Sequence, residues 1–393
     1  LEISNLFLEL PKADLAQNEV EIGDFKLRNS IITIYTDTEN NGIVQKVEEI
    51  KDNVKEDIQK FEWPNYKIAI ASVDVDKSNV NYFVGKNEVK RDVFNPNAIA
   101  LRNLTLKATN ILLKDKKAGL NLEALTFKEG SGFNLNELAL KLEATDNFLA
   151  VNDIKLSLND NKLKGQIRLD YESLASLIET PDQSKVALNF PDFQLDLKEV
   201  FKFQPALKKN EYLQTLSKKY LSGNVKAAGY LSSIQIPNLN IRWGNSTRIA
   251  ANGLIQNATT PKNLKFNIPN FSAQTKRRDL IQFVSEKGLG INLPEAISIK
   301  GNTKGNLEDV YLKANLNTSQ GIAIIDGHFK NSSQISFEAD LEIKEYKLNE
   351  LLLNEQLGPI SLNLNTKGSG TTINTLDATM EATVSRFQFN DYA

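Results

Sequence analysis

An aliphatic triplet with the spacing apolar-x-x-apolar-x-apolar recurs along the chain, and polar residues with a turn soon follow each copy. Four clear copies lie between residues 101 and 156, namely Leu101-Leu104-Leu106, Leu122-Leu125-Phe127, Leu135-Leu138-Leu140 and Val151-Ile154-Leu156. Alternation of apolar and polar residues is typical of a β-strand with one apolar and one polar face. Since the pattern runs through almost the whole chain, it predicts an unusually large amount of one-sided apolar sheet.

The same pattern divides the chain into five segments. Residues 1–42 predict strands, and residues 65–170 predict a leucine-rich meander whose short turns favour antiparallel neighbours. Residues 43–64 predict an amphipathic helix or linker, because apolar residues recur there every three or four positions. Residues 171–221 predict a helical interruption around a strand near 186–197. Residues 222–393 predict further strands, with helices near 278–287 and 347–357.

Such a chain predicts a mainly β fold in which one mostly antiparallel sheet grows strand by strand, accompanied by a few short amphipathic helices. About 25 strands side by side at ~4.8 Å would extend for roughly 120 Å. Ordinary open sheets rarely exceed ~10 strands without curling or splitting. Three architectures therefore remain open: a curled trough, a spiral, or several packed β-sandwiches with closed apolar cores.

Composition narrows the classes of function. The net charge is -2 and the positive charges are scattered singly, so we expect no nucleic-acid partner. No run of about 18 apolar residues exists, and no signal peptide is visible. Cysteine is absent, which excludes disulfides and thiolate metal sites. Because the chain begins at Leu1 and stops within a predicted strand, we expect a fragment of a longer protein.

Few residues suggest catalysis or metal binding. His328 is the one histidine, and a surface or turn position is the simpler interpretation. Asp74 and Asp76 share a strand face and could form a carboxylate pair, but a solvated outer face opposite Val73 and Val75 is the favoured interpretation. Residues 159–162 could suggest a calcium loop, yet they lack the glycine and the distal glutamate, so a hairpin turn is favoured. We therefore expect neither an enzyme nor a cofactor.

The apolar face itself is the remaining candidate site. A lining of Leu, Ile, Val and some Phe without polar anchor points suits acyl chains, which have no hydrogen-bonding groups to match. The candidate lining residues are the twelve of the four triplets: Leu101, Leu104, Leu106, Leu122, Leu125, Phe127, Leu135, Leu138, Leu140, Val151, Ile154 and Leu156.

Several stretches resemble the TamB family of translocation and assembly module subunits in its Bacteroidota form, within the wider AsmA-like group of bridge-type lipid-transfer proteins. The resemblance covers essentially the whole chain and depends on many weak, non-catalytic similarities. They are the opening residues 1–15 (LEISNLFLELPKADL), Phe61-Glu-Trp63-Pro64, residues 239–247 (LNIRWGNST), residues 278–283 (RDLIQF) and residues 354–358 (NEQLG).

The resemblance implies a curled sheet of U-shaped cross-section, often likened to a taco, with a continuous hydrophobic groove. It also implies a periplasmic location, with an inner-membrane anchor outside this chain. The implied partners are phospholipid acyl chains and an Omp85/TamA-like outer-membrane barrel protein, contacted through a region outside the fragment. The implied role is lipid transport between the membranes in outer-membrane biogenesis, with no catalytic residues or cofactor.

Two other functions fit the same pattern. An open sheet edge could pair with incoming strands, as in a scaffold or chaperone for outer-membrane β-barrel proteins. A structural extracellular β-protein is also conceivable, although such proteins usually show fixed-period repeats or calcium loops.

Overall fold

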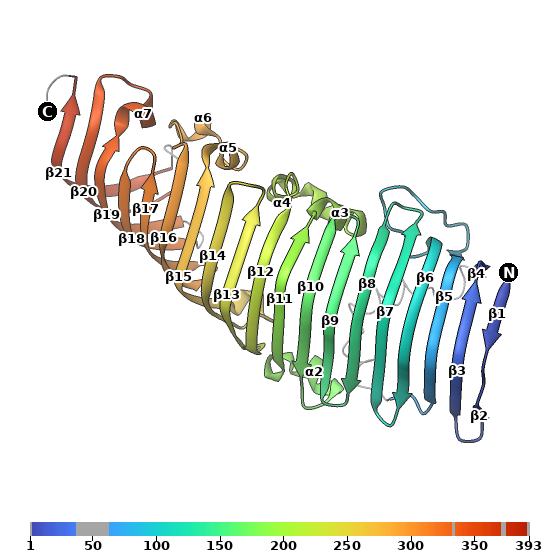
Figure 1. The fold of residues 1–393 in the computed structure, drawn as a ribbon. Coiled ribbons are helices and arrows are strands. Elements are labelled where there is room, and N and C mark those ends of the chain that lie inside the picture. The colour runs from blue at the N-terminus through green and yellow to red at the C-terminus, as the bar shows by residue number, and fades with distance from the viewer. Residues whose placement is uncertain (1, 37–62, 332–334, 371–374, 391–393) are drawn as a thin grey trace. The chain divides into compact units, whose positions relative to one another are not determined.

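All strands that the computed structural model describes belong to one open, mostly antiparallel sheet of 21 strands. The structure describes residues 2–36, 63–331, 335–370 and 375–390. Only a few short helices accompany the sheet, which confirms the predicted mainly β fold (Figure 1). The chain divides into two compact units, Leu1–Leu213 and Gln214–Ala393, and each is described by itself.

In the first unit, each strand from β5 onward pairs antiparallel with the next in the chain. The leucine-rich meander predicted for residues 65–170 corresponds to β5 through β10. The strands of this unit are β1 Asn5–Leu8, β2 Lys12–Asp14, β3 Glu19–Arg28, β4 Ile31–Thr36, β5 Lys67–Val84, β6 Ala98–Lys114, β7 Lys117–Glu129, β8 Asn134–Thr145, β9 Phe148–Leu158, β10 Asn161–Asp170 and β11 Lys185–Leu195.

The start of the first unit departs from the antiparallel pattern. Strands β3 and β4 both pair with the long strand β5 in parallel, with Glu19 opposite Lys67 and Ile31 opposite Asn79. Between them Asn29 takes a positive φ of 49°, which asparagine tolerates better than most residues. Two consecutive short strands thereby follow one edge of β5.

A β-bulge lies inside each of the four triplets. Each of β6, β7, β8 and β9 carries one residue more than its neighbour at this point, so that two residues oppose one. The extra residue lets apolar side chains three positions apart point to the same face. The extra residues are Asn103, Glu123, Asn136 and Asp153, of which Asn103 and Asp153 have φ values of 52° and 54°.

In the second unit, each strand from β12 to β21 pairs antiparallel with the next. Bulges recur on β13 at Pro237-Asn238 and on β15 at Pro269-Asn270, whereas the pairings from β16 to β19 have none. Its strands are β12 Leu221–Tyr230, β13 Ser233–Trp243, β14 Thr247–Gln256, β15 Lys265–Lys276, β16 Ala296–Asn306, β17 Asp309–Thr318, β18 Ile322–Asn331, β19 Ile335–Lys347, β20 Leu357–Ser369 and β21 Asp377–Phe389.

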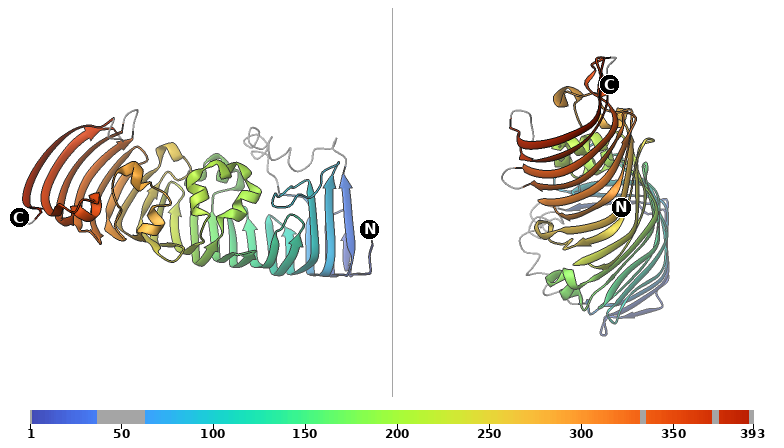
Figure 2. Two further views of the ribbon diagram at one scale, coloured as in Figure 1. Left: turned by 90° about the horizontal axis from the view of Figure 1, so that it is seen from above. Right: turned by 90° about the vertical axis from the view of Figure 1, so that its left-hand side faces the viewer.

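The helices are shorter than the hydrophobic pattern predicts. Those in the described ranges are α2 Leu174–Glu179, α3 Leu197–Phe203, α4 Glu211–Leu216, α5 Arg277–Leu280, α6 Glu286–Leu289 and α7 Leu348–Leu352, with 3-10 turns η1 Pro181–Gln183, η2 Pro205–Lys209 and η3 Pro261–Asn263. In each unit these helices lie to one side of the curved strands (Figure 2). No helix in the described ranges is long and apolar enough to cross a membrane.

Two predicted helices differ from the observed ones for local reasons. The helix predicted at 278–287 is split into α5 and α6, and Gly288 lies inside α6, while Gly290 at φ 67° ends it. The helix predicted at 347–357 ends at Leu352 because Leu353 adopts a left-handed conformation, and residue 357 already begins β20. Of the segment predicted as a helix or linker at 43–64, residues 43–62 lie outside the described residues.

Candidate functional site

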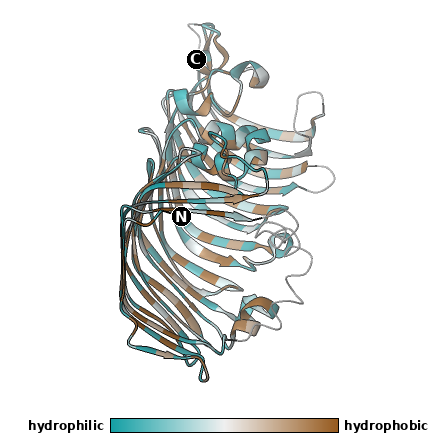
Figure 3. Cartoon of the chain, turned by 90° about the vertical axis from the view of Figure 1, so that its right-hand side faces the viewer, coloured by the Kyte–Doolittle hydropathy of each residue, from teal (hydrophilic) through white to brown (hydrophobic). Residues whose placement is uncertain are grey.

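The structure places all twelve candidate lining residues on one face of β6 to β9. The pairing sets apolar side chains opposite one another on neighbouring strands: Leu106 opposite Leu125, Leu122 opposite Leu140, and Leu138 opposite Leu156. Figure 3 shows that hydrophobic residues recur as bands along the strands. The twelve side chains therefore form one contiguous apolar surface in the first unit.

No second sheet covers this surface, because all described strands belong to the one sheet. The alternative of stacked β-sandwiches is therefore wrong for the described residues. Only three of the candidates, Leu122, Leu135 and Ile154, are buried, with exposed fractions of 6% to 9%. The other nine are half-buried, so solvent reaches much of the predicted lining.

The apolar face of the second unit is more open. Ile249 on β14 and Phe329 on β18 lie opposite apolar neighbours, yet 42% and 40% of their surfaces are exposed. At the edge strand β21, Met380 and Val384 lie opposite Thr366 and Leu362 and are 58% and 52% exposed. A one-layer sheet with large exposed aliphatic side chains departs from ordinary folded surfaces, and such patches mark binding sites.

Short helical segments cap one end of this face in the second unit. Trp243, at the end of β13, is 3% exposed, and its Nε1 donates to the carbonyl of Leu216 at 2.8 Å. The ring of Phe283 lies 5.2 Å from the indole, and Lys219 Nζ lies 4.4 Å above it. The segment around α5 is thus fixed to the apolar side of the sheet.

A buried carboxylate anchors the same cap. Asp279 in α5 is 1% exposed and is bound by Lys219, while Ser246 Oγ and Thr247 Oγ1 each donate to it at 2.7 Å. Burial by itself would raise the pKa of Asp279, but the hydrogen bonds from Lys219, Thr247 and Ser246 outweigh it and hold the pKa below its usual value. Asp279 therefore remains ionised and fully paired.

An aromatic cluster has the corresponding position in the first unit. Phe133, between β7 and β8, is 3% exposed and lies 4.4 Å from Phe203 of α3, ring to ring. Phe94 contacts both, at 5.8 and 5.3 Å. Lys202 pairs with Glu199 at 3.0 Å beside this cluster. The cluster fixes α3 against the β7–β8 connection.

Trp63, in one of the stretches that resemble the TamB family, is tied to a distant hairpin. Its Nε1 donates to Asp146 Oδ1 at 3.0 Å, and Lys116 Nζ contacts the other oxygen at 2.9 Å. The bond from Lys116, aided by that from Trp63, lowers the pKa of Asp146. This contact joins the start of β5 to the β6–β7 and β8–β9 turns.

The isolated polar candidates have structural partners. His328 Nε2 lies 2.7 Å from Asp309 Oδ1, and its ring stacks on Tyr311 at 3.9 Å. Asp74 is paired with Arg28, whose hydrogen bonds lower the pKa of that carboxyl. Asn159, at φ 49°, forms a turn as favoured from the sequence. Within the described ranges, no group of three or more His, Cys, Asp or Glu side chains could hold a metal ion.

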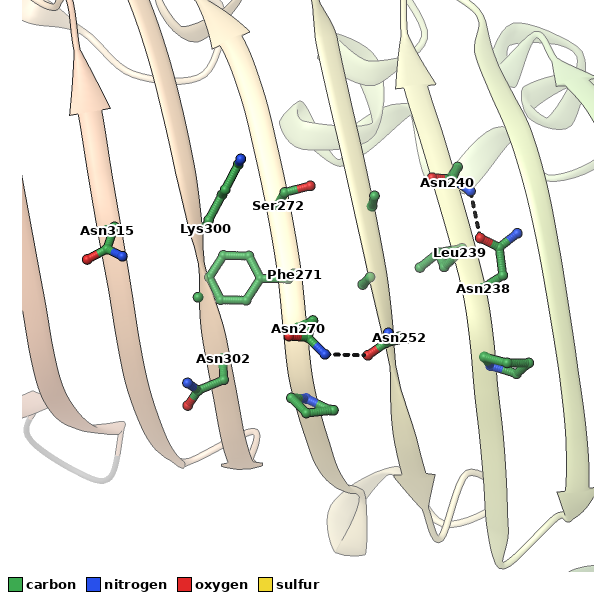
Figure 4. Close-up of a pocket in the computed structure, with 15 residues that line it drawn as sticks. Asn238, Leu239, Asn240, Asn252, Asn270, Phe271, Ser272, Lys300, Asn302 and Asn315 are labelled. Atoms are coloured by element: carbon green, nitrogen blue, oxygen red, sulfur yellow. Dashed lines mark hydrogen bonds between the residues drawn. The ribbon is translucent and has the colours of Figure 1, made fainter.

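Three hollows lie mainly on the other, polar face, where the hydrophobic pattern predicted none, although the predicted lining residues Leu122, Leu140 and Ile154 also border the first of them. One of about 600 Å³ lies over β7 to β11, and one of about 360 Å³ lies over β18 to β21. A third, of about 560 Å³, lies over β13 to β17 and is lined by asparagines (Figure 4). The repeated Ile-Pro-Asn step at 236–238 and 268–270 could have revealed this third hollow, because it marks the two bulges that form its floor.

Comparison with known proteins identifies no relative. No protein-family model matches the chain. No curated protein and no solved structure matches it either. The resemblance to the TamB family therefore stays a prediction.

Proposed function

We propose that this chain is part of a hydrophobic conduit that moves phospholipids between the inner and outer membranes through the periplasm. The observation that supports it is the half-exposed apolar face of a single-layered sheet. Each Å² of apolar surface left in water costs about 25 cal/mol relative to burial. Acyl chains lying on the face would remove that cost without requiring polar partners.

The lining residues suit this role because they bind acyl chains without fixing them in one position. Half-buried leucines such as Leu138, Leu140 and Leu156 offer dispersion contacts but no directional bonds. A surface of this kind binds chains of differing length and position, as movement along it requires. The location, the two membranes and the barrel partner come from the family resemblance and belong to the proposal.

A decisive experiment compares charges on the two faces of one strand. Leu156→Asp places a carboxylate on the apolar face, and Ser157→Asp places one on the polar face of the same strand. Native mass spectrometry of the purified protein should show bound phospholipid for the parent and for Ser157→Asp. Leu156→Asp should remain folded by circular dichroism and lose the lipid. Absence of lipid from the folded parent chain would refute the conduit.

A scaffold for β-barrel assembly is the second candidate, and one observation favours it. The 13-residue strand β21 pairs with β20 on one side, and no described strand pairs with its other side. Such an edge can accept an incoming strand. A photo-crosslinker at Thr379 should capture unfolded barrel proteins if this function holds, whereas crosslinks to lipid from Met380 favour the conduit.

A further inference from the structure

The polar face of the second unit changes character along the sheet. Strands β12 to β16 contain no Asp or Glu, although all of their residues are described. The same strands carry seven cationic side chains: Lys226, Arg242, Arg248, Lys265, Lys276, Lys300 and Lys304. By contrast, the hollow over β18 to β21 is lined by Asp326, Asp340, Glu342 and Glu381. One part of a nearly neutral chain is therefore distinctly positive.

The cations near the asparagine-lined hollow are not neutralised by any residue that the structure describes. Arg242 and Arg248 lie opposite each other on β13 and β14, and Lys300 lies opposite Asn315 on β16 and β17. None of these three side chains forms an ion pair or a hydrogen bond with a described residue. On the polar face of the first unit, Lys141 is instead paired with Asp153 at 2.8 Å. The second unit thus presents positive charge that lacks a counter-charge.

The hollow between these cations is built of amides. The bulges at Pro237-Asn238 and Pro269-Asn270 supply two of these amides. A bulge changes the direction in which the side chains of a strand point. Asn224 Oδ1 accepts from the Nδ2 of both Asn238 and Asn240, the latter at 3.0 Å. Asn270 Nδ2 donates to Asn252 Oδ1 at 3.4 Å. Figure 4 shows the labelled amides spread across neighbouring strands, several of them bonded in pairs.

Two further amides have hydrogen-bonding capacity to spare. Asn302 and Asn315 line the same hollow and are exposed, and their side-chain amides form no hydrogen bond with a described residue. An amide offers two donors and one acceptor oxygen. Hydroxyl groups of a sugar ring are both donors and acceptors and match such a surface. Amides repeated from strand to strand, at a spacing of ~4.8 Å, also match a chain of sugar units laid across the strands.

We propose that the polar face of β12 to β17 binds a linear acidic polysaccharide. The asparagines bind the hydroxyl groups of sugar units in the hollow, and Arg242, Arg248 and Lys300 bind carboxylates carried by the chain. This site is independent of the proposed lipid conduit, which uses the opposite face of the same sheet.

Other polyanions fit this face less well. Single-stranded nucleic acid is bound through aromatic side chains on which its bases stack. The polar-face positions that line the hollow carry no aromatic side chain, since Phe271 belongs to the apolar set opposite Gly301. The exposed Tyr311 lies on the polar face of β17 outside the hollow, and its ring is already stacked on His328 at 3.9 Å. A lipid surface would require apolar side chains that insert between headgroups. The amides and cations of the hollow supply no such group.

The test is titration of the whole chain with oligogalacturonate, followed by calorimetry at ~150 mM salt, where long-range attraction between charges is screened. Asn302→Ala and Asn315→Ala should each weaken binding by about fivefold, because each removes side-chain hydrogen bonds to the ligand and none to a described residue. Arg242→Gln should weaken binding and reduce its dependence on salt. Asn363→Ala, which lies in the acidic hollow on the same face, is the matched control and should bind like the parent.

Uncharged cello-oligosaccharide, short oligothymidylate and phosphatidylglycerol vesicles separate the alternatives. The proposal expects the neutral sugar to bind more weakly than oligogalacturonate and with the same dependence on Asn302. It is overturned if oligogalacturonate does not bind, if oligothymidylate or vesicles bind as tightly, or if the amide variants bind like the parent.

Discussion

Ile154 on β9 lies directly opposite Gly165 on β10, at the point where the bulge of β9 ends. Gly165 has φ 155°, and a Cβ built there would lie 2.3 Å from the backbone oxygen of Asn189 on the next strand. The backbone of the adjacent strand β11 therefore occupies the space that a side chain at residue 165 would need. Close approach of the backbones, and not flexibility, explains this glycine.

Gly165→Ala should destabilise the first unit markedly. The contact with the backbone of Asn189 cannot be relieved by a rotamer change, so we expect a loss of about 3 kcal/mol in the free energy of unfolding. The control is Gly290→Ala, since Gly290 at φ 67° has no atom within 4 Å of the added Cβ and should cost only about 1 kcal/mol. Urea denaturation measures both, and equal losses would contradict the steric explanation.

Asp279→Ala should release the cap of the second unit from the sheet. The loss in the free energy of unfolding should be about 2–3 kcal/mol, because the part-exposed Lys219 loses its counter-charge and the hydroxyls of Ser246 and Thr247 lose their acceptor. The emission of Trp243 should shift to longer wavelength, since Lys219 and Phe283 cover its indole. A Trp63→Phe background leaves Trp243 as the one fluorophore of its kind. An unchanged spectrum in the folded variant would show that Asp279 does not hold the cap.

The same carboxylate predicts a dependence of stability on pH. Its pKa is lower in the folded than in the unfolded chain, where an aspartate titrates near ~3.9, so ionised Asp279 stabilises the fold above that value. The stabilisation is lost as the pH falls below about 4 through the folded pKa. The difference in unfolding midpoint between the parent and Asp279→Asn should therefore be constant near neutrality and shrink in acid. A difference that grows in acid would mean that protonation of Asp279 stabilises the fold, and would refute a folded pKa below the unfolded one.

The extent to which the sequence predicts this fold depends on the range of the interactions involved. Alternation is a local property, so Leu106, Leu125 and Leu138 were placed on the apolar face correctly. The step of three between Leu101 and Leu104 was visible in the sequence, but its cause was not, because a bulge is defined by pairing with another strand. The parallel pairing of β3 with β5 is likewise a tertiary feature.

The caps were the least predictable part of the candidate site. Lys219 and Asp279 are 60 positions apart, and nothing near either residue indicates the other. The helix predicted at 278–287 satisfied an apolar spacing, yet the buried Asp279 and the contact of Phe283 with Trp243 decide where α5 ends. Tertiary contacts override local helical preference in such short segments.

A last prediction concerns the bulges. Deleting the extra residue of a bulge should affect the fold less than deleting a regular residue of the same strand. Deletion of Asn103 leaves Leu101, Leu104 and Leu106 in strict alternation, so all three keep the apolar face. Deletion of Thr105 would turn Leu104 toward the polar face and Asn103 toward the apolar one. Exposing the leucine costs about 2–3 kcal/mol. The amide would lose part of its solvation on the half-exposed apolar face, which adds about 1 kcal/mol.

Urea denaturation should therefore show a loss of no more than about 2 kcal/mol for the Asn103 deletion, which removes one hydrogen bond to Asn79 and relaxes a positive φ. The Thr105 deletion should lose about twice as much. Hydrogen exchange of β5 and β7 amides tests the mechanism, because the first deletion keeps the pairing on both sides of β6 and the second disrupts it. If the two deletions were equally damaging, the extra residue would be required for folding itself, and the bulge would be more than a local insertion that bends the strand.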